Sequence, residues 1–268
     1  MIKSSEIEKL VEMLKARGVF LYHSCQYTDF QSYLELGGIP SRKKLTDENK
    51  SFTKFETDAE DKKNGVWDKV FFNLQDFGTI FEKGRTGVPT VYGPILFIVR
   101  PESLLEANDV AVALRSAGSP SFDRKTEALS SVEDIDRIFL HSANDGTYRR
   151  TYIRSTSKIK EEFGKDYVSN PEISLTVSTG LISLAHVEEV KVDPYMLGNK
   201  ILLSHIAASK REKNYGLTGR SRKYSKKQKA ILKDITNILL TCELSLEEFV
   251  KHERLHRNNL ASKSVISR

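Results

Sequence analysis

Residues 20–30, FLYHSCQYTDF, carry an apolar and aromatic run directly into His23, after which the chain turns polar. Val19 to Tyr22 is β-branched and aromatic, which predicts a short buried strand. Residues 28–36 have the spacing of a helix, and Gly37-Gly38 predicts its end. The pattern therefore places a histidine at the end of a strand, where a new helix begins.

The composition is ordinary for a globular protein with one large domain, or one domain and an appendage. The chain has 268 residues, of which 39% are hydrophobic and 29% charged. No apolar run approaches the roughly 18 residues of a membrane span, and the N-terminus lacks a secretory signal. Cys25 and Cys242 are too few for a disulfide framework or a cysteine-rich zinc site. We expect no membrane partner, no metal and a reducing cytoplasm.

Helix and strand signals both occur along the first 195 residues. The first helix is marked by the capping box Ser5/Glu8, and Gly18 marks its end. Strands are expected at 70–73, 94–100, 173–178 and 187–192, and a helix at 130–142. The polar stretch 43–65 has little periodicity and is expected to be a long loop. The apolar face of the first helix is predicted from Ile7, Leu10, Val11 and Leu14.

Beyond Pro194 the composition becomes basic, so residues 196–268 are expected to form a separate, helical extension. Its net positive stretch, 209–229, interleaves Tyr215 and Tyr224 with cations and has one acid, Glu212. Such a stripe can neutralise phosphates and stack bases, and a solvated linker is the equal alternative. The candidate nucleic-acid contacts are Arg220, Arg222, Lys223, Lys226 and Lys227.

Two residues could carry chemistry, although each has a plainer explanation. His23 could be a structural histidine, and Glu172, in SNPEISL, could be a solvated carboxylate at the start of a strand. The common glycine-rich nucleotide-binding, zinc-protease and serine-hydrolase motifs do not occur.

The order of four segments resembles DarT-like ADP-ribosyltransferases. These segments are LYHSCQYTDFQSYLELGGIPSR (21–42), GVWDKVFFNLQDFGTIFE (65–82), YGPILFIV (92–99) and NPEISLTVSTGLISLAHVEEVKV (170–192). In that family the first contains a strand ending in Tyr-His, and the last opens with an acidic residue. The resemblance implies that residues 1–195 form an α+β domain, with a split pair of mixed or antiparallel sheets that form an NAD cleft.

The resemblance also implies a role for each site residue. Glu172 would face the positive charge that develops on the ribose when the nicotinamide bond breaks. Tyr22 and His23 would bind NAD, with His23 on the adenosine ribose. Arg42 is the candidate for the NAD phosphates, with Lys43, Lys44, Lys54, Lys62 and Lys63 as alternatives. Nicotinamide stacking would fall to Phe72, Phe77 or Phe81, each of which could instead be plain core.

The implied function is transfer of ADP-ribose from NAD to a nucleobase, in single-stranded DNA. The implied setting is a toxin–antitoxin or phage-defence system, with an antitoxin protein as partner. Two alternatives stay open: a transferase acting on RNA or protein, and a nucleic-acid-binding module without activity. Release of nicotinamide separates the enzymes from the module.

Overall fold

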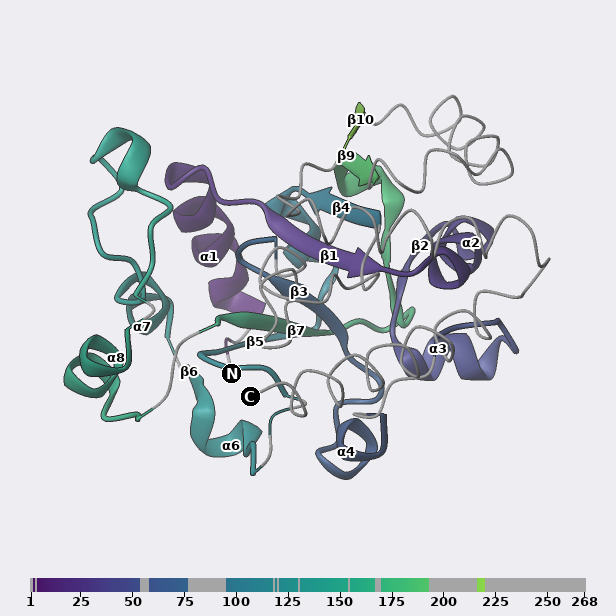
Figure 1. Cartoon of the computed structure of the whole chain (residues 1–268), viewed down its shortest axis with the longest axis horizontal. Helices are drawn as coiled ribbons and strands as arrows, with labels where there is room; N and C mark the ends of the chain where they lie inside the picture. The colour runs from purple at the N-terminus through teal and green to yellow at the C-terminus, as the bar shows by residue number, and fades with distance from the viewer. Residues whose placement is uncertain are drawn as a thin grey trace, which may run out of the picture.

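The computed structural model describes residues 2, 4–53, 58–76, 95–117, 119, 121–129, 131–153, 155–166, 170–192 and 216–219. Within these ranges helices surround a large, mainly antiparallel sheet (Figure 1). The α-helices are α1 (Ser4–Ala16), α2 (Tyr27–Leu36), α3 (Arg42–Asp47), α4 (Asp58–Lys63), α6 (Arg124–Glu127), α7 (Val132–Asp136) and α8 (Thr156–Phe163). Short 3-10 helices are η1 (Pro101–Glu106), η2 (Gly146–Tyr148) and η3 (Leu184–His186).

Eight strands form the main sheet in the order β10-β9-β4-β1-β3-β7-β5-β6, and two more form a small second sheet, β2-β8. Every pairing in the main sheet is antiparallel except β9 with β10. The strands are β1 (Leu21–Cys25), β2 (Gly38–Pro40), β3 (Val70–Asn73), β4 (Ile95–Val99), β5 (Asp109–Ala113), β6 (Ala128–Leu129), β7 (Glu172–Thr176), β8 (Leu181–Ser183), β9 (Val187–Val192) and β10 (Gly216–Gly219).

The strand pairing in the main sheet is shortest at the centre of the sheet, between β1 and β3. These strands share the register pair Tyr22–Asn73, whereas β1 and β4 pair along five residues. The sheet thus has two well-paired halves, β9-β4-β1 and β3-β7-β5, that meet over a short length. The prediction of helices with antiparallel strands is confirmed, but eight of the described strands form one joined sheet, beside the two-stranded sheet β2-β8, in place of two small sheets.

The core explains why the apolar patterns form these elements. Ile7, Leu10, Val11 and Leu14 are all buried, which confirms the predicted face of α1, and α1 packs on η1, α7 and β5. All five residues of β4 are buried, as expected for a continuous apolar run at the centre of a sheet. The helix begins at Ser4, so the predicted cap at Ser5 is wrong: Ser5 lies inside the first turn.

His23 lies in the middle of β1 and not at its end, because the strand runs from Leu21 to Cys25. The sequence prediction ended this strand too early, at Tyr22. Polar Ser24 follows His23 without breaking the pairing, since it is held opposite Leu96 of β4.

The turn after α2 is made by two glycines with different tasks. Gly37 ends the helix in the left-handed conformation, at φ 72°, as predicted. At Gly38 an added Cβ would lie 2.5 Å from Leu181 Cδ1 and 2.7 Å from the Ile182 carbonyl oxygen. The close approach of β2 to β8 therefore requires glycine at position 38. Strand β2 then leads directly into α3.

The predicted long loop at 43–65 is wrong, because α3 and α4 lie within it. Each has six residues, too few for an apolar period to show in the sequence. The Ser41 hydroxyl caps α3 by accepting the Lys44 N–H, and α4 has acids in its first turn and lysines in its last, which matches the helix dipole. The predicted helix at 130–142 is also shorter than expected, since α7 ends at Asp136.

Figure 1 shows α7 and α8 at one side of the molecule, away from α2 and α3. Beyond Val192 the described part of the chain consists of β10, which lies inside the predicted extension and pairs in parallel with β9. The boundary at 195/196 and the helical structure expected in the extension lie outside the described residues and stay predictions. In the ranges that the structure describes, none of the helices combines the length and apolarity that crossing a bilayer requires.

Candidate functional site

A cavity of about 240 Å³ lies where the two halves of the sheet separate. It brings together three of the residues singled out in the sequence: His23 from β1, Arg42 from α3 and Glu172 from β7. These residues are far apart in the chain, so only the fold makes them neighbours. The remaining lining residues are Ser24, Asp29, Tyr33, Pro40, Asp58, Asp61, Val66, Trp67, Lys69 and Phe71.

His23 bridges the separating strands through both ring nitrogens. Nδ1 lies 2.8 Å from the Phe71 carbonyl oxygen of β3. A carbonyl can only accept a hydrogen bond, so Nδ1 carries the proton of the neutral ring. Nε2 then accepts the hydroxyl of Tyr33 at 3.1 Å. Burial lowers the pKa of His23, and burial raises the pKa of Tyr33 well above its usual value, so both groups stay neutral near pH 7.

The consequence for His23 differs from the sequence expectation. Both of its nitrogens are engaged within the protein, so in this conformation a ribose hydroxyl would have to displace Tyr33 to reach the ring. The histidine instead ties β1 to β3 and orients the Tyr33 hydroxyl, which lines the cavity beside it.

Arg42 is fixed to α2 by a buried carboxylate. Its Nη1 lies 3.3 Å from Oδ1 of Asp29, whose side chain is only 2% exposed. The same carboxylate accepts the backbone N–H groups of Gln26 at 3.1 Å and Thr53 at 2.9 Å. The guanidinium also lies over the ring of Phe52, 5.0 Å from its centroid. Asp29 therefore joins three segments and holds a cation at the cavity wall.

Glu172 opens β7 in the middle of the sheet, where it pairs with Asn73 of β3 and Ala113 of β5. Its Oε1 accepts the backbone N–H of Ala117 at 2.8 Å. Burial raises the pKa of Glu172 to about 7, against the hydrogen bonds from Ala117 and the Ser116 side chain, and nearby Asp61 adds to the rise. The plainer explanation offered by the sequence, a well-solvated carboxylate, is wrong because the loop after β5 covers this end of β7.

Replacing Glu172 by glutamine is expected to stabilise the protein at alkaline pH. Below about pH 4.5 the carboxyl is protonated in both the folded and the unfolded chain, so the substitution changes little. Between about 4.5 and about 7 the folded state keeps a proton that the unfolded state has lost, and wild-type stability falls as pH rises. Above pH 7 the free energy of unfolding of Glu172→Gln is expected to exceed that of wild type by up to about 3 kcal/mol.

Urea unfolding of both proteins at about pH 5, 6 and 8 measures this gain. Glu188→Gln is the matched control, because Glu188 forms an exposed ion pair with Arg100. A stability difference between wild type and Glu172→Gln that does not vary with pH would contradict the assigned burial of the carboxylate.

Helix α4 supplies a wall of the cavity that sequence reasoning missed. Asp58 and Asp61 line the cavity, and burial raises the pKa of Asp61 to about 6. Trp67 lines it as well, with Lys62 Nζ 4.4 Å from the ring centroid. The acid-first, lysine-last pattern of DAEDKK was the available signal for this helix.

The other predicted site residues are placed elsewhere. Phe72 is fully buried and meets the His23 ring edge-on at 5.8 Å, so it belongs to the core and offers no face for nicotinamide. Its neighbour Phe71 lines the cavity instead. Tyr22 is half-buried and is not among the residues that line the cavity. Phe77, Phe81, Arg220, Arg222, Lys223, Lys226 and Lys227 lie outside the described residues.

The chain matches no known protein-family model and no curated protein. Among solved structures it is similar to DarT from Thermus sp. 2.9 in complex with NAD+, with a TM-score of 0.42 and 9% identity over 75% of this chain and 95% of that one. It is likewise similar to the same protein in complex with ADP-ribosylated ssDNA, with a TM-score of 0.43 and 10% identity over 75% of this chain and 94% of that one. The function proposed below is supported by the geometry of the cavity and not by this distant similarity.

Proposed function

We propose that the chain is an NAD-dependent ADP-ribosyltransferase that modifies a nucleobase in single-stranded DNA. The observation that carries the proposal is the cavity itself, whose lining combines a carboxylate at the start of a central strand, an arginine fixed by Asp29 and a neutral histidine–tyrosine pair. In the reaction the bond between ribose C1′ and the nicotinamide nitrogen breaks, and nicotinamide leaves with the electron pair. The base forms the new bond at C1′ and gives up a proton.

Glu172 would supply the electrostatic part of this reaction. Cleavage of the bond builds positive charge on the ribose, and an ionised carboxylate in a water-poor site stabilises it more strongly than one in water. With a pKa of about 7, Glu172 is partly ionised at neutral pH. The rate is therefore expected to rise with pH through this range.

Arg42 and Trp67 would bind the rest of NAD. A guanidinium suits a diphosphate because its planar donors match phosphate oxygens, and Asp29 holds it in place before substrate arrives. Trp67 and Phe71 give the cavity aromatic surface of the kind that planar ligands pack against. His23 would act by orienting Tyr33.

What supports a nucleic-acid acceptor is the basic, tyrosine-containing segment 209–229 in the sequence. The setting we propose is a toxin or phage-defence effector in the cytoplasm, kept in check by an antitoxin protein.

The test uses NAD labelled in its adenylate phosphate, incubated with the full chain and a mixture of single-stranded DNA, single-stranded RNA and protein. Label on DNA, with an equal amount of free nicotinamide, is the expected result. Label on RNA or protein would show that the acceptor is not DNA. If no mixture releases nicotinamide, the chain is not a transferase and is at most a nucleic-acid-binding module.

NAD binding can be followed separately, because Trp67 is the single tryptophan of the chain. NAD is expected to change its fluorescence in a saturable way, since the indole lines the cavity. A fluorescence signal that NAD leaves unchanged would count against this cavity as the NAD site.

A further inference from the structure

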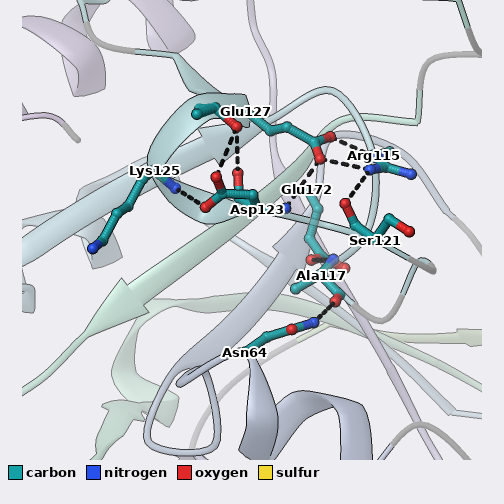
Figure 2. Close-up of polar contacts among 9 residues, drawn as sticks. Asn64, Arg115, Ala117, Ser121, Asp123, Lys125, Glu127 and Glu172 are labelled. Carbon is teal, nitrogen blue, oxygen red and sulfur yellow. Dashed lines mark hydrogen bonds and ion pairs between the residues drawn. The ribbon is translucent and has the colours of Figure 1, made fainter.

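We propose that Asn64 is a positioning residue for Glu172, acting through the backbone of Ala117. Ala117 is held from two sides: its N–H donates to Glu172 Oε1 at 2.8 Å, and its carbonyl accepts from Asn64 Nδ2 at 3.0 Å. Figure 2 shows Ala117 between the two side chains. One peptide segment thus links the end of α4 to the candidate catalytic carboxylate.

Asn64 is well placed to hold this segment still. Its backbone N–H donates to the Glu60 carbonyl at 2.8 Å, so it continues the last turn of α4. The same helix carries Asp58 and Asp61 into the cavity. The side chain of Ala117 is 3% exposed and packs in a small apolar cluster with Val66 and Phe122. The contact therefore sets the position of Ala117 relative to the wall formed by α4.

The loop that contains Ala117 is also fixed by an ion pair between Arg115, which precedes Ala117, and Glu127, which follows it. Arg115 makes two parallel contacts to Glu127, Nε to Oε2 and Nη2 to Oε1, each 2.5 Å long. Glu127 is 8% exposed and also accepts the Asp123 N–H at 3.1 Å. Arg115 Nη2 donates to the Ser121 carbonyl at 3.1 Å. This clamp shapes the loop (Figure 2), but only Asn64 ties Ala117 itself to α4 among the described contacts.

The contact between Asn64 and Ala117 affects the charge state of Glu172. Its carboxylate is desolvated, and the Ala117 N–H and Ser116 side chain are the donors that favour its charged form. Both belong to the segment that Asn64 restrains, so releasing that segment weakens both together. The other ionisable groups that line the cavity are His23, Asp29, Tyr33, Arg42, Asp58, Asp61 and Lys69, and removing a neutral amide from position 64 changes none of their charges.

The same contacts are also compatible with the opposite role for Asn64, that of an inhibitory contact. The Ala117 N–H occupies an oxygen that a ribose hydroxyl could use, so the link could hold the site closed. The two roles predict effects of opposite sign when the link is cut, because a positioning residue lowers the rate when removed and an inhibitory contact raises it.

The experiment compares wild type with Asn64→Ala and, in case alanine impairs folding, Asn64→Ser, whose hydroxyl is too short to span the contact. Lys125→Ala is the matched control, since Lys125 is exposed on α6 and the substitution keeps its backbone N–H bond to Asp123. Glutamate side chains labelled with ¹³C at the carboxyl carbon are titrated by NMR, and the Glu172 signal is identified by its loss in Glu172→Gln. Nicotinamide release is measured across the same pH range.

In the Asn64 variants the pKa of Glu172 is expected to rise by about 0.5 or more, and the acid limb of the rate profile to move with it. Lys125→Ala is expected to change neither the Glu172 titration nor the rate profile. A folded Asn64 variant with an unchanged Glu172 titration, or with a faster reaction, would overturn the proposal. The inference about rate rests on the proposed transferase function, but the NMR titration does not: wild type without nicotinamide release would refute the function while the titration still decides the role of Asn64.

Discussion

Glutamine in place of Glu172 is expected to lower nicotinamide release and ADP-ribose transfer by about 100- to 1000-fold, the usual effect of removing a group that faces developing charge. Glutamine keeps the size of the side chain and can still accept the Ala117 N–H, so the loop after β5 should stay in place. The loss then reflects the missing negative charge. Single-turnover assays with labelled NAD measure it directly.

Two controls make this result interpretable. Fluorescence of Trp67 should still report NAD binding in Glu172→Gln, because binding and chemistry use different parts of the cavity. Glu188→Gln, which alters an exposed ion pair at β9, should keep wild-type activity. Near-wild-type turnover in Glu172→Gln would show that another group faces the ribose. A variant that is more stable at about pH 8 and also inactive would support both the burial and the catalytic role of this carboxylate.

Asp29→Ala is expected to cost about 3–5 kcal/mol of folding free energy, the largest stability effect of any substitution considered for this site. The substitution leaves the half-buried guanidinium of Arg42 without this partner and removes the acceptor of two backbone N–H groups, those of Gln26 and Thr53. A loss of this size is enough to unfold many domains. Equilibrium unfolding in urea measures it.

Asp47→Ala provides the comparison, because Asp47 pairs with Lys43 on an exposed face of α3. Exposed pairs contribute about 1 kcal/mol or less, so this variant should unfold near the wild-type midpoint. Equal effects of the two substitutions would mean that Asp29 does not join α2, α3 and the Thr53 segment as described. Asp29→Asn, which keeps one acceptor oxygen, should fall between them.

Local sequence patterns were sufficient to predict a helix or strand wherever burial follows directly from residue type. The face of α1, the end of α2 at Gly37 and the strands β3, β4 and β9 could all be predicted, because apolar period and glycine conformation act over a few residues. Short helices could not be predicted in this way. Helices α3 and α4 are too brief to repeat an apolar period: α3 is held by its Ser41 cap and the buried Leu45, and α4 has no buried residue.

The candidate residues of the site can be read from the sequence: a histidine in an aromatic strand, an arginine after the first glycine turn and a glutamate before an apolar strand. The role of each depends on contacts that form when the chain folds. His23 has both nitrogens engaged because β1 and β3 separate beside it. Glu172 has a pKa of about 7 because a loop from β5, 55 residues earlier in the chain at Ala117, covers it. Solvation and charge depend on distances through space, so residues remote in sequence set them.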